Sequence, residues 1–471
     1  MSLLVDLGYD LGTTVTKVTA VAEDSTRLLD RSLPTVWQER EGHTQRRPES
    51  LLADVEDLLA QVAADLPAGS RIRSVGFTAM AEAGVLVDRE GAACSPVIAW
   101  FDPRGADEAA ALPADLAHDF PARTGLPVSH VASFFKLLWL REQGLDLAGL
   151  TWLGVPEYVV HRLGGRRVAE LSLLGRTGLW DVHTGAPYTA ALDHLGVAPD
   201  LLPEAVAAGT PAGTVRADHP VAAARGAVLT VAGHDHAVAA AATGCGSPGS
   251  ALDSFGTAEA YVAAAAHVPD PDVVRDLAVA GISVYPHVVR DAVGLIGGTR
   301  TGLVLSRVQR VLGATQDPAR DALDEATLRL APGETADVRV TGYGMADREV
   351  AIHTGSEAHT PAHVWRAALD GGTARARELL GLLGDAGVPV DRLVVAGGWT
   401  RMRSVVAARR DLAPVVEVSD LDQPGTLGAA RFGAWAATRD GDPGPDPRPP
   451  ADWFPGARPA DPIPIPQEAT P

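Results

Sequence analysis

The stretch LLVDLGYDLGTTVTKVTAV at residues 3–21 contains two apolar, β-like runs, Leu3–Tyr9 and Val15–Val21, around the turn Gly12–Thr14. A charged turn and a third apolar run, Leu28–Val36, follow directly. Short runs separated by tight turns are typical of consecutive antiparallel strands. The sequence therefore predicts that the chain begins with a β-meander and not with a βαβ unit.

Helices and further strands are predicted to complete a mixed sheet around this meander. After Pro48, apolar residues recur at the spacing of one helix face, and Ile72–Thr78 then has the pattern of a strand. The runs Val85–Val87 and Ser95–Trp100 lie on either side of the turn Asp88–Gly91. This arrangement predicts a hairpin.

A similar order of elements restarts in the second half of the chain. Strand patterns such as Leu252–Phe255 return after Gly233, and a long helical pattern covers Ala362–Leu383. We predict an α/β protein with two domains, residues 1–233 and 234–440, each with a mixed sheet flanked by helices. A mostly helical insertion is predicted at about 106–176, and a Pro-rich tail at 441–471. Because ligands favour clefts between domains, an inter-domain catalytic cleft is expected.

Composition narrows the class of partner. The formal net charge of -19 over 471 residues would repel phosphate backbones and anionic lipid, so neither nucleic acid nor a membrane surface is an expected partner. Two cysteines are too few for a disulfide framework and fit a reducing cytoplasm. We expect no signal peptide and no membrane span, because no basic and apolar leader and no run of about 18 apolar residues occurs.

The first candidate site is Asp10 together with the turn Gly12-Thr13-Thr14. Backbone amides and hydroxyls in such a turn can donate to phosphate oxygens, and a neighbouring carboxylate can hold Mg²⁺ against the transferring group. A plain hairpin turn is the competing interpretation. The nearby Asp6-Leu7-Gly8 shows how readily the pattern D-x-G arises by chance.

The second candidate is Gly233-His234-Asp235-His236, which follows the predicted strand Ala227–Ala232 and precedes an Ala-rich helix. An Asp at a helix start is commonly an N-cap. The two histidines have no third ligand nearby in the sequence, which disfavours a metal site. The functional hypothesis is a carboxylate that accepts the proton of a sugar hydroxyl as the hydroxyl attacks phosphorus.

Two glycine-containing turns in the second half complete the set. Gly256-Thr257 repeats the strand, Gly-Thr, strand design of the first turn. Gly397-Gly398 ends an apolar strand before a helix, where a flat base could lie against bare backbone. An ordinary strand-to-helix turn is the alternative at 397–398. A dinucleotide fingerprint is excluded, because no G-x-G-x-x-G follows a first strand.

In order and spacing, these elements resemble the FGGY carbohydrate kinases, a family grouped with hexokinase, actin and the heat-shock ATPases. The resemblance extends from about Leu4 to Ala436 and includes further motifs. These are Trp100-Phe101-Asp102 with Arg104 (W-N-D-x-R), Thr124–Pro127 followed by Lys136–Leu140 (T-G-x-P…K-x-x-W-L), Arg176-Thr177 (S-R-T) and Gly425–Ala430 (the C-terminal G-A-A helix).

The resemblance implies two actin-like, ribonuclease H-like domains and phosphoryl transfer from MgATP to a sugar or polyol. By analogy, Asp235 would be the general base. The remaining roles implied by the family are Mg²⁺ association for Asp10 and Asp235, nucleotide contact for Thr13, Thr14, Gly256, Thr257, Gly302, Gly397 and Gly398, and substrate contact for Met80, Ala81, Glu82, Asp102 and Asp235. Dimerisation is common in the family, so a homodimer is included among the expectations.

Some positions depart from the family pattern. Pentulose kinases usually carry Met-His and glycerol kinases Arg-Glu where this chain has Ala81-Glu82. A carboxylate at 82 still suits a polyol, because it can accept hydrogen bonds from two hydroxyls. Leucines replace polar residues within Ala169–Thr177, and Trp399 replaces a small residue at the expected base pocket. A ketose such as a pentulose is the expected acceptor.

Two other functions were weighed against the kinase. A nucleotide-dependent switch or chaperone-like ATPase would bind a protein and phosphorylate no sugar, but the helical insertion and the segment Trp100–Arg104 argue against it. A non-catalytic sugar-binding relative would not be expected to retain Asp10, Asp235 and both Gly-Thr turns. The sequence therefore favours an ATP-dependent carbohydrate kinase.

Overall fold

The computed structural model describes residues 3–331, 334–335, 337–345, 347, 349–356, 358–439 and 448–454. The chain divides into two compact units. Unit 1 contains the described residues of Met1–Gly246, Ala265–Leu295 and Gln423–Pro455, and unit 2 contains those of Ser247–Ala264 and Ile296–Asp422. In the described part of the chain, no helix is long and apolar enough to cross a membrane.

The predicted meander is confirmed in unit 1. Strands β1 (Leu4–Leu11), β2 (Val15–Ala22) and β3 (Arg27–Pro34) are consecutive antiparallel neighbours. The full sheet has the order β14-β15-β6-β1-β2-β3, in which β6 (Arg71–Ala79) is parallel to both β1 and β15 (Val228–His234). Parallel alignment brings the carboxyl ends of these three strands to one edge of the sheet.

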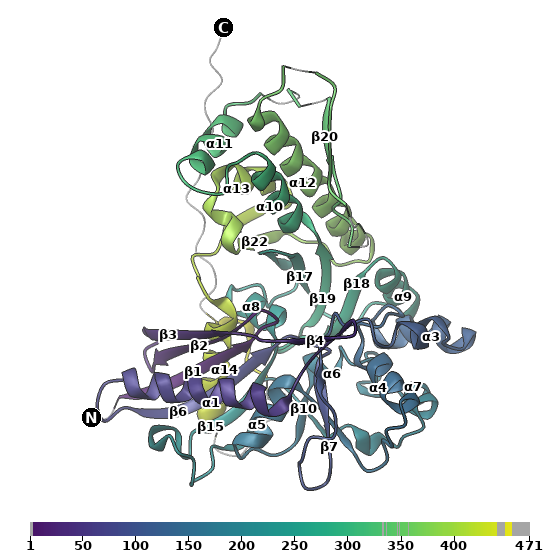
Figure 1. Cartoon of the computed structure of the whole chain (residues 1–471), viewed down its shortest axis with the longest axis vertical. Coiled ribbons are helices and arrows are strands. Elements are labelled where there is room, and N and C mark those ends of the chain that lie inside the picture. The colour runs from purple at the N-terminus through teal and green to yellow at the C-terminus, as the bar shows by residue number, and fades with distance from the viewer. Residues whose placement is uncertain are drawn as a thin grey trace. The chain divides into compact units, whose positions relative to one another are not determined.

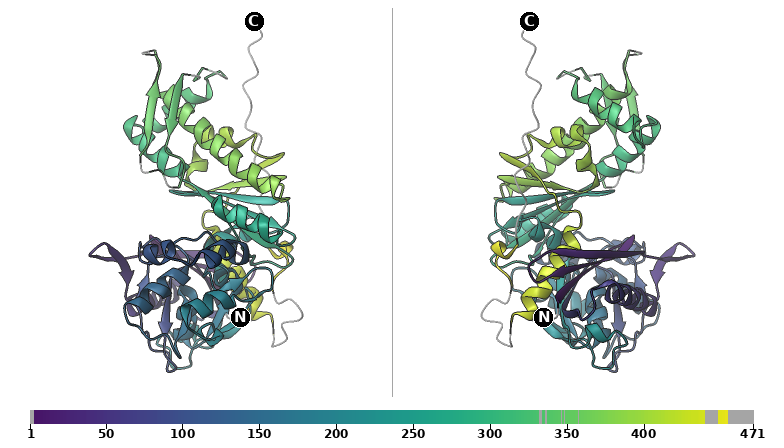
Figure 2. Two further views of the ribbon diagram at one scale, coloured as in Figure 1. Left: turned by 90° about the vertical axis from the view of Figure 1, so that its right-hand side faces the viewer. Right: turned by 90° about the vertical axis from the view of Figure 1, so that its left-hand side faces the viewer.

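The alternation of side chains along β1 determines how helices cover this sheet. Tyr9 points to one face, where its hydroxyl donates to the backbone of Val55 in α1 (Pro48–Asp65). Gly8 points to the other face, where a Cβ atom would lie 1.8 Å from the Thr426 carbonyl oxygen of α14 (Pro424–Ala437). Glycine is therefore required for the close packing of α14, shown in yellow in Figure 2, on the strands.

The hairpin predicted from Val85–Val87 and Ser95–Trp100 forms only next to its turn. Val87 makes an antiparallel bridge with Ala93, but the main partner of β7 (Gly84–Val87) is the distant strand β9 (Thr151–Gly154). Strand β8 (Val97–Ile98) instead pairs with β5 (His43–Arg46). The apolar runs indicated strands but carried no information about long-range partners.

The region 106–176, predicted as a mostly helical insertion, contains several helices and contributes to an apolar core. Phe120, Phe134 and Phe135 are fully buried and pack against one another with ring centroids 5.0–5.6 Å apart. The elements of this region are α2 (Ala106–Ala110), α3 (Ala114–Thr124), α4 (Ser133–Glu142), β9, α5 (Val155–Leu163), β10 (Val168–Glu170) and α6 (Leu171–Leu174).

Unit 2 is built on a second mixed sheet. Within the unit, neighbouring strands follow the order β19-β17-β16-β22-β23. Their bounds are β16 (Ser250–Phe255), β17 (Glu259–Ala265), β19 (Val293–Thr299), β22 (Arg392–Ala396) and β23 (Val415–Val418). Helices α10 (Thr301–Val311), α11 (Ala319–Leu328), α12 (Pro361–Asp385) and α13 (Arg403–Arg409) pack together beside it (Figure 1).

The compact units do not follow the sequence boundaries at 233 and 440. Helix α14 and the segment Ala265–Leu295 belong to unit 1, although both lie beyond residue 233. Of the predicted tail 441–471, only residues 448–454 are described. They include a short 3₁₀ turn, Ala451–Trp453, whose Trp453 ring packs 5.1 Å from that of Trp435 in α14.

Candidate functional site

Asp235 lies at the junction of β15 and α8 (Asp235–Ala242), as the sequence predicts. It is the first helical residue, and His234 holds the N-cap position without a side-chain capping bond, so the N-cap interpretation of Asp235 is wrong. Asp235 Oδ1 accepts a hydrogen bond from the His236 backbone at 2.7 Å. The side chain remains 26% exposed, so it is available to a ligand.

The electrostatic surroundings of Asp235 favour a base that works near neutral pH. Desolvation raises the pKa of Asp235 to about 7, the His236 hydrogen bond opposes this rise, and Glu82 adds to it. His234 Nε2 lies 3.2 Å from Asp235 Oδ1, and desolvation lowers the pKa of His234. The neighbouring imidazole is therefore neutral.

Asp10 is the second-to-last residue of the central strand β1 and lies close enough to Asp235 for their charges to interact. Desolvation and the charge of Asp235 raise the pKa of Asp10 to about 7. Among the described residues, Asp10 Oδ1 has no hydrogen-bond partner although it is buried. A buried carboxylate oxygen without a protein partner is suited to a cation or to a cation-bound water. No group of three His, Cys, Asp or Glu residues in the described chain could hold a metal by itself.

The first turn is held by two tryptophans, Trp100 of the recognised Trp100-Phe101-Asp102 motif and Trp37, which the motif search did not identify. Trp100 Nε1 donates to Thr13 Oγ1 at 2.9 Å, and Trp37 Nε1 donates to the Thr13 carbonyl at 2.7 Å. Thr14, the next residue, has an exposed side chain. Thr13 is thus fixed in place, and Thr14 is open to a ligand.

Glu82 is positioned by its backbone and by an arginine. Its φ of 62° lies in the left-handed region that non-glycine residues rarely adopt. Arg176 Nε donates to Glu82 Oε1 at 2.7 Å, and the Arg176 guanidinium lies 6.0 Å from the Tyr285 ring centroid. Met80 and Ala81 are buried beneath this segment. The structure thus brings Glu82 and Asp235 into one charged group with Arg176.

Asp102 has a different environment from Glu82. It is fully buried, and its carboxylate accepts hydrogen bonds from Arg104 Nε at 2.7 Å and Arg104 Nη2 at 2.9 Å. The carboxylate also accepts hydrogen bonds from the backbone amides of Arg104, at 2.9 Å, and of Thr44. These contacts anchor the segment that follows Trp100, and direct contact between Asp102 and a substrate stays a prediction.

Sequence reasoning missed Arg176 and Tyr285 as members of this charged group. Arg176 belongs to a recognised motif, but the motif alone gave it no role. Tyr285 comes from β18 (Ile282–Pro286), far along the chain, and its hydroxyl has no hydrogen-bond partner among the described residues. No local pattern connects these residues, because only the packing of β18 beside α6 places them together.

In unit 2, three of the five predicted nucleotide residues line a pocket of about 380 Å³, and Gly302 and Gly397 are not among its lining residues. Gly256, Thr257 and Gly398 contribute to its wall together with Trp399, and Ser306 and Gln309 are lining residues that the motif search missed. Ser306 and Gln309 follow Gly302 at helical spacings of four and seven, so they lie on one face of α10. This spacing is a signal that could have identified them.

Gly302 and Gly397 allow the backbone segments of this pocket to approach closely. A Cβ atom on Gly302 would lie 2.0 Å from the Gly256 carbonyl oxygen. Gly397 has a φ of 120°, and its Cβ would lie 2.3 Å from the Phe255 carbonyl oxygen. The two glycines therefore pack α10 and the 397–398 turn against the Gly-Thr turn.

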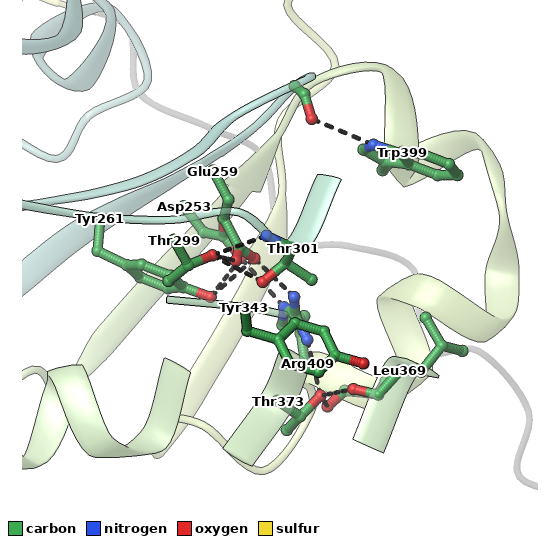
Figure 3. A network of polar contacts seen from close by, with 12 residues as sticks. Asp253, Glu259, Tyr261, Thr299, Thr301, Tyr343, Leu369, Thr373, Trp399 and Arg409 are labelled. Carbon is green, nitrogen blue, oxygen red and sulfur yellow. Dashed lines mark hydrogen bonds and ion pairs between the residues drawn. The ribbon is translucent and has the colours of Figure 1, made fainter. Parts of the chain in front are cut away.

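Trp399 connects the Gly397-Gly398 turn to the Gly256-Thr257 turn. Its Nε1 donates to the Gly256 carbonyl at 3.1 Å, as the dashed line in Figure 3 shows. Its ring packs on Trp365, a fully buried side chain of α12, at 5.9 Å between centroids. The tryptophan that departs from the family pattern therefore links the double glycine to the Gly-Thr turn.

Comparison with known proteins connects these features to one family. Residues 5–242 match the FGGY family of carbohydrate kinases, N-terminal domain. The L-fuculokinase of Salmonella typhi is 27% identical over 77% of this chain and 77% of its own length. The xylulose kinase of Streptomyces coelicolor is 27% identical over 75% of this chain and 72% of its own length. The solved xylulose kinase of Rhodospirillum rubrum is 25% identical, with a TM-score of 0.81 over 92% of this chain and 90% of that one.

Proposed function

Because the chain belongs to the FGGY family of carbohydrate kinases, we propose that it transfers the γ-phosphate of ATP to a hydroxyl of an open-chain ketose, such as a pentulose. Asp235 is the general base in this proposal. It accepts the proton of the attacking hydroxyl, which increases the nucleophilicity of the oxygen as the bond to phosphorus forms.

The observation that carries this proposal is the position of Asp235 beside the Glu82–Arg176 ion pair. A general base works best when its pKa lies near the operating pH, and desolvation raises the pKa of Asp235 to about 7. The partly exposed carboxylate can reach a hydroxyl, whereas Glu82 is held by Arg176. Asp235 is thus available for proton transfer, and Glu82 is available for substrate positioning.

The acceptor class follows from the chemistry of Glu82. A carboxylate oriented by Arg176 can accept hydrogen bonds from neighbouring hydroxyls, and the buried Tyr285 hydroxyl supplies a further polar group nearby. A ketose with several free hydroxyls matches this set. Two of the relatives are an L-fuculokinase and a xylulose kinase, names that refer to ketose acceptors.

The nucleotide is assigned to the pocket of unit 2. A volume of about 380 Å³ lies within the usual range for a small-molecule site. The amides at the beginning of α10, next to the Gly256-Thr257 turn, can donate to phosphate oxygens, and the helix dipole favours negative charge there. The face of α10 that carries Ser306 and Gln309 is left for the nucleoside.

Asp10 fits the role of the Mg²⁺-associated carboxylate. Its partnerless, buried Oδ1 and the lack of a complete protein cage agree with the preference of Mg²⁺ for one or two carboxylates, waters and substrate phosphates. When bound, Mg²⁺ neutralises charge that develops on the phosphate oxygens. Thr13 and Thr14 supply hydroxyl and amide donors beside Asp10.

Coupled ADP release with MgATP and a panel of ketopentoses, deoxyketohexoses, polyols and aldonic acids tests this proposal. We expect ADP release that depends on the sugar and is greatest with a ketose. ADP release with an aldonic acid alone would contradict the acceptor class. Release that is independent of every small acceptor but stimulated by a protein would contradict the kinase and favour a nucleotide-dependent switch.

A further inference from the structure

A buried charged cluster lies beneath the Gly256-Thr257 turn of unit 2. Arg409, Asp253 and Glu259 have fully buried side chains. Arg409 Nη2 donates to Glu259 Oε1 at 2.6 Å, and Arg409 Nε lies 3.4 Å from Asp253 Oδ2. Figure 3 shows the guanidinium directed at both carboxylates. None of these three residues lines the pocket, so they do not contact a nucleotide bound there. Any role of the cluster in the reaction must act through the Gly256-Thr257 turn.

The cluster holds both strands that form the turn. Asp253 is on β16, which ends at Phe255, and Glu259 is the first residue of β17. Tyr261 joins the two carboxylates, because its hydroxyl lies 3.0 Å from Glu259 Oε1 and 3.3 Å from Asp253 Oδ2. The Arg409 guanidinium also covers the Phe255 ring at 4.6 Å from the centroid. Arg409 therefore contacts the chain on each side of Gly256-Thr257.

The cluster also reaches the beginning of α10. Glu259 Oε2 accepts a hydrogen bond from Thr299 Oγ1, which lies 2.6 Å from Thr301 Oγ1. Thr301 is the first residue of α10, and the next residue, Gly302, is the one in close contact with the Gly256 carbonyl. A displacement of Glu259 would therefore shift the turn and the helix N-terminus relative to each other.

The last contact of Arg409 connects the cluster to α12. Arg409 Nη1 donates to Thr373 Oγ1 at 2.7 Å, and Thr373 Oγ1 in turn lies 2.8 Å from the Leu369 carbonyl. Arg409 itself ends α13, which begins shortly after the double glycine. One side chain thus connects the helices behind the pocket to the turn in front of it.

The positions of Asp253 and Glu259 depend on the positive charge of Arg409. Desolvation and the charge of Glu259 raise the pKa of Asp253 well above its usual range, and Arg409 opposes this rise. Arg409 is the cation that faces both buried carboxyl groups. A buried ion cluster seldom stabilises a protein more than apolar side chains of the same volume would, so fold stability alone is a weak reason for it.

We propose that Arg409 is a positioning residue for the nucleotide, which fixes the Gly256-Thr257 turn and the N-terminus of α10 at the spacing that the phosphates require. This inference rests on the assignment of the nucleotide to unit 2. Donors that bind phosphate must be held within a fraction of an ångström, and a supporting layer of side chains usually provides that rigidity.

The test compares two Arg→Met variants of the same unit. Arg409→Met removes the cluster's cation, and Arg392→Met removes the Arg392–Glu417 ion pair between β22 and β23, which is not part of the pocket. For each variant we would measure the dissociation constant of ADP by calorimetry, the KM for ATP and for the sugar, and the thermal midpoint. We expect Arg409→Met to weaken ADP binding at least about tenfold, with the KM for the sugar little changed. Arg392→Met should lower the thermal midpoint without this selective effect.

A third variant separates positioning from folding. Asp253→Asn, Glu259→Gln and Arg409→Met together remove all three ionisable groups while keeping similar volumes, so no uncompensated charge stays buried. We expect this variant to fold and still bind ADP weakly. ADP affinity equal to that of the parent, in either folded Arg409 variant, would overturn the inference. A parent that binds no ADP would instead overturn the assignment of the nucleotide to unit 2.

Discussion

Arg176 and Glu82 form an ion pair in which two guanidinium nitrogens approach one carboxylate oxygen, at 2.7 and 2.5 Å. The second carboxylate oxygen is not part of this contact. Glu82 has a left-handed backbone, which directs its side chain differently from an extended residue at the end of β6. Arg176 also lowers the pKa of Asp235, so one arginine acts on both carboxylates.

The first prediction concerns Glu82→Gln. Loss of a charged acceptor should weaken sugar binding by about 1.5–3 kcal/mol, which is roughly a 10- to 150-fold increase in the KM for the sugar. The KM for ATP should change much less. Exposed Glu90, on the nearby turn, provides the matched control Glu90→Gln, which should behave as the parent. Equal increases in both KM values would contradict the assignment of Glu82 to the substrate.

The second prediction concerns Asp10→Asn. The variant should lose activity by at least about a hundredfold, because a neutral amide cannot replace a carboxylate that holds Mg²⁺. Added Mg²⁺ should restore little of this activity. Calorimetry of ADP with and without Mg²⁺ gives a readout that does not depend on turnover. A variant whose ADP affinity responds to Mg²⁺ in the same way as that of the parent would remove Asp10 from the metal site.

The third prediction uses two glycines of unit 2. Gly302→Ala places a methyl group 2.0 Å from a backbone oxygen of the Gly-Thr turn, so the turn or α10 must move. ADP affinity should fall by roughly 10- to 100-fold. In Gly381→Ala, in α12, the new methyl group meets no atom of the described residues within 4 Å and should stabilise the protein by up to about 1 kcal/mol without affecting ADP. Indistinguishable ADP affinities of the two variants would contradict the close packing at Gly302.

The fourth prediction concerns His287 in unit 1. Desolvation, aided by the charge of Arg448, lowers the pKa of His287 to about 3. The unfolded residue binds a proton near its usual pKa of about 6.5, so between pH 6.5 and 3 the unfolded state holds the additional proton. The stabilisation that neutral His287 provides is complete above pH 6.5 and decreases by about 1.4 kcal/mol per pH unit below it.

Urea unfolding of the parent and of His287→Asn at several pH values checks this prediction. Asparagine keeps an acceptor for the Val289 backbone amide, which donates to His287 Nδ1 at 3.2 Å, but it does not titrate. The free energy of unfolding of the variant should therefore fall less steeply between pH 6.5 and 4.5. Parallel pH profiles would show that His287 is protonated in the folded protein.

Much of the fold could be predicted because its signals are local. The alternation in β1 and β2 and the helical spacing after Pro48 specify their elements directly, and the structure has them within a few residues. Strand β22 and the beginning of α14 lie where the apolar runs and Pro424 indicate. The position of Asp235 between a strand and a helix could be predicted for the same reason.

Features that depend on distant contacts could not be predicted. The partner of β7 lies more than sixty residues along the chain, and helix α14 returns from the C-terminal region to pack on β1. Arg409 looked like one of many arginines on a helix, since its carboxylate partners are about 150 residues earlier. The burial of Arg409 depends on tertiary packing. The spacing of apolar residues along one helix does not reveal that packing.

The central claim is that Asp235 is the base of a carbohydrate kinase, and Asp235→Asn tests it most directly. Turnover of the best ketose and the dissociation constant of ADP would be measured for the parent and the variant. Loss of a general base should lower kcat by about 10²- to 10⁴-fold, while ADP binding to unit 2 should be unchanged. An Asn variant with parental kcat would contradict the account.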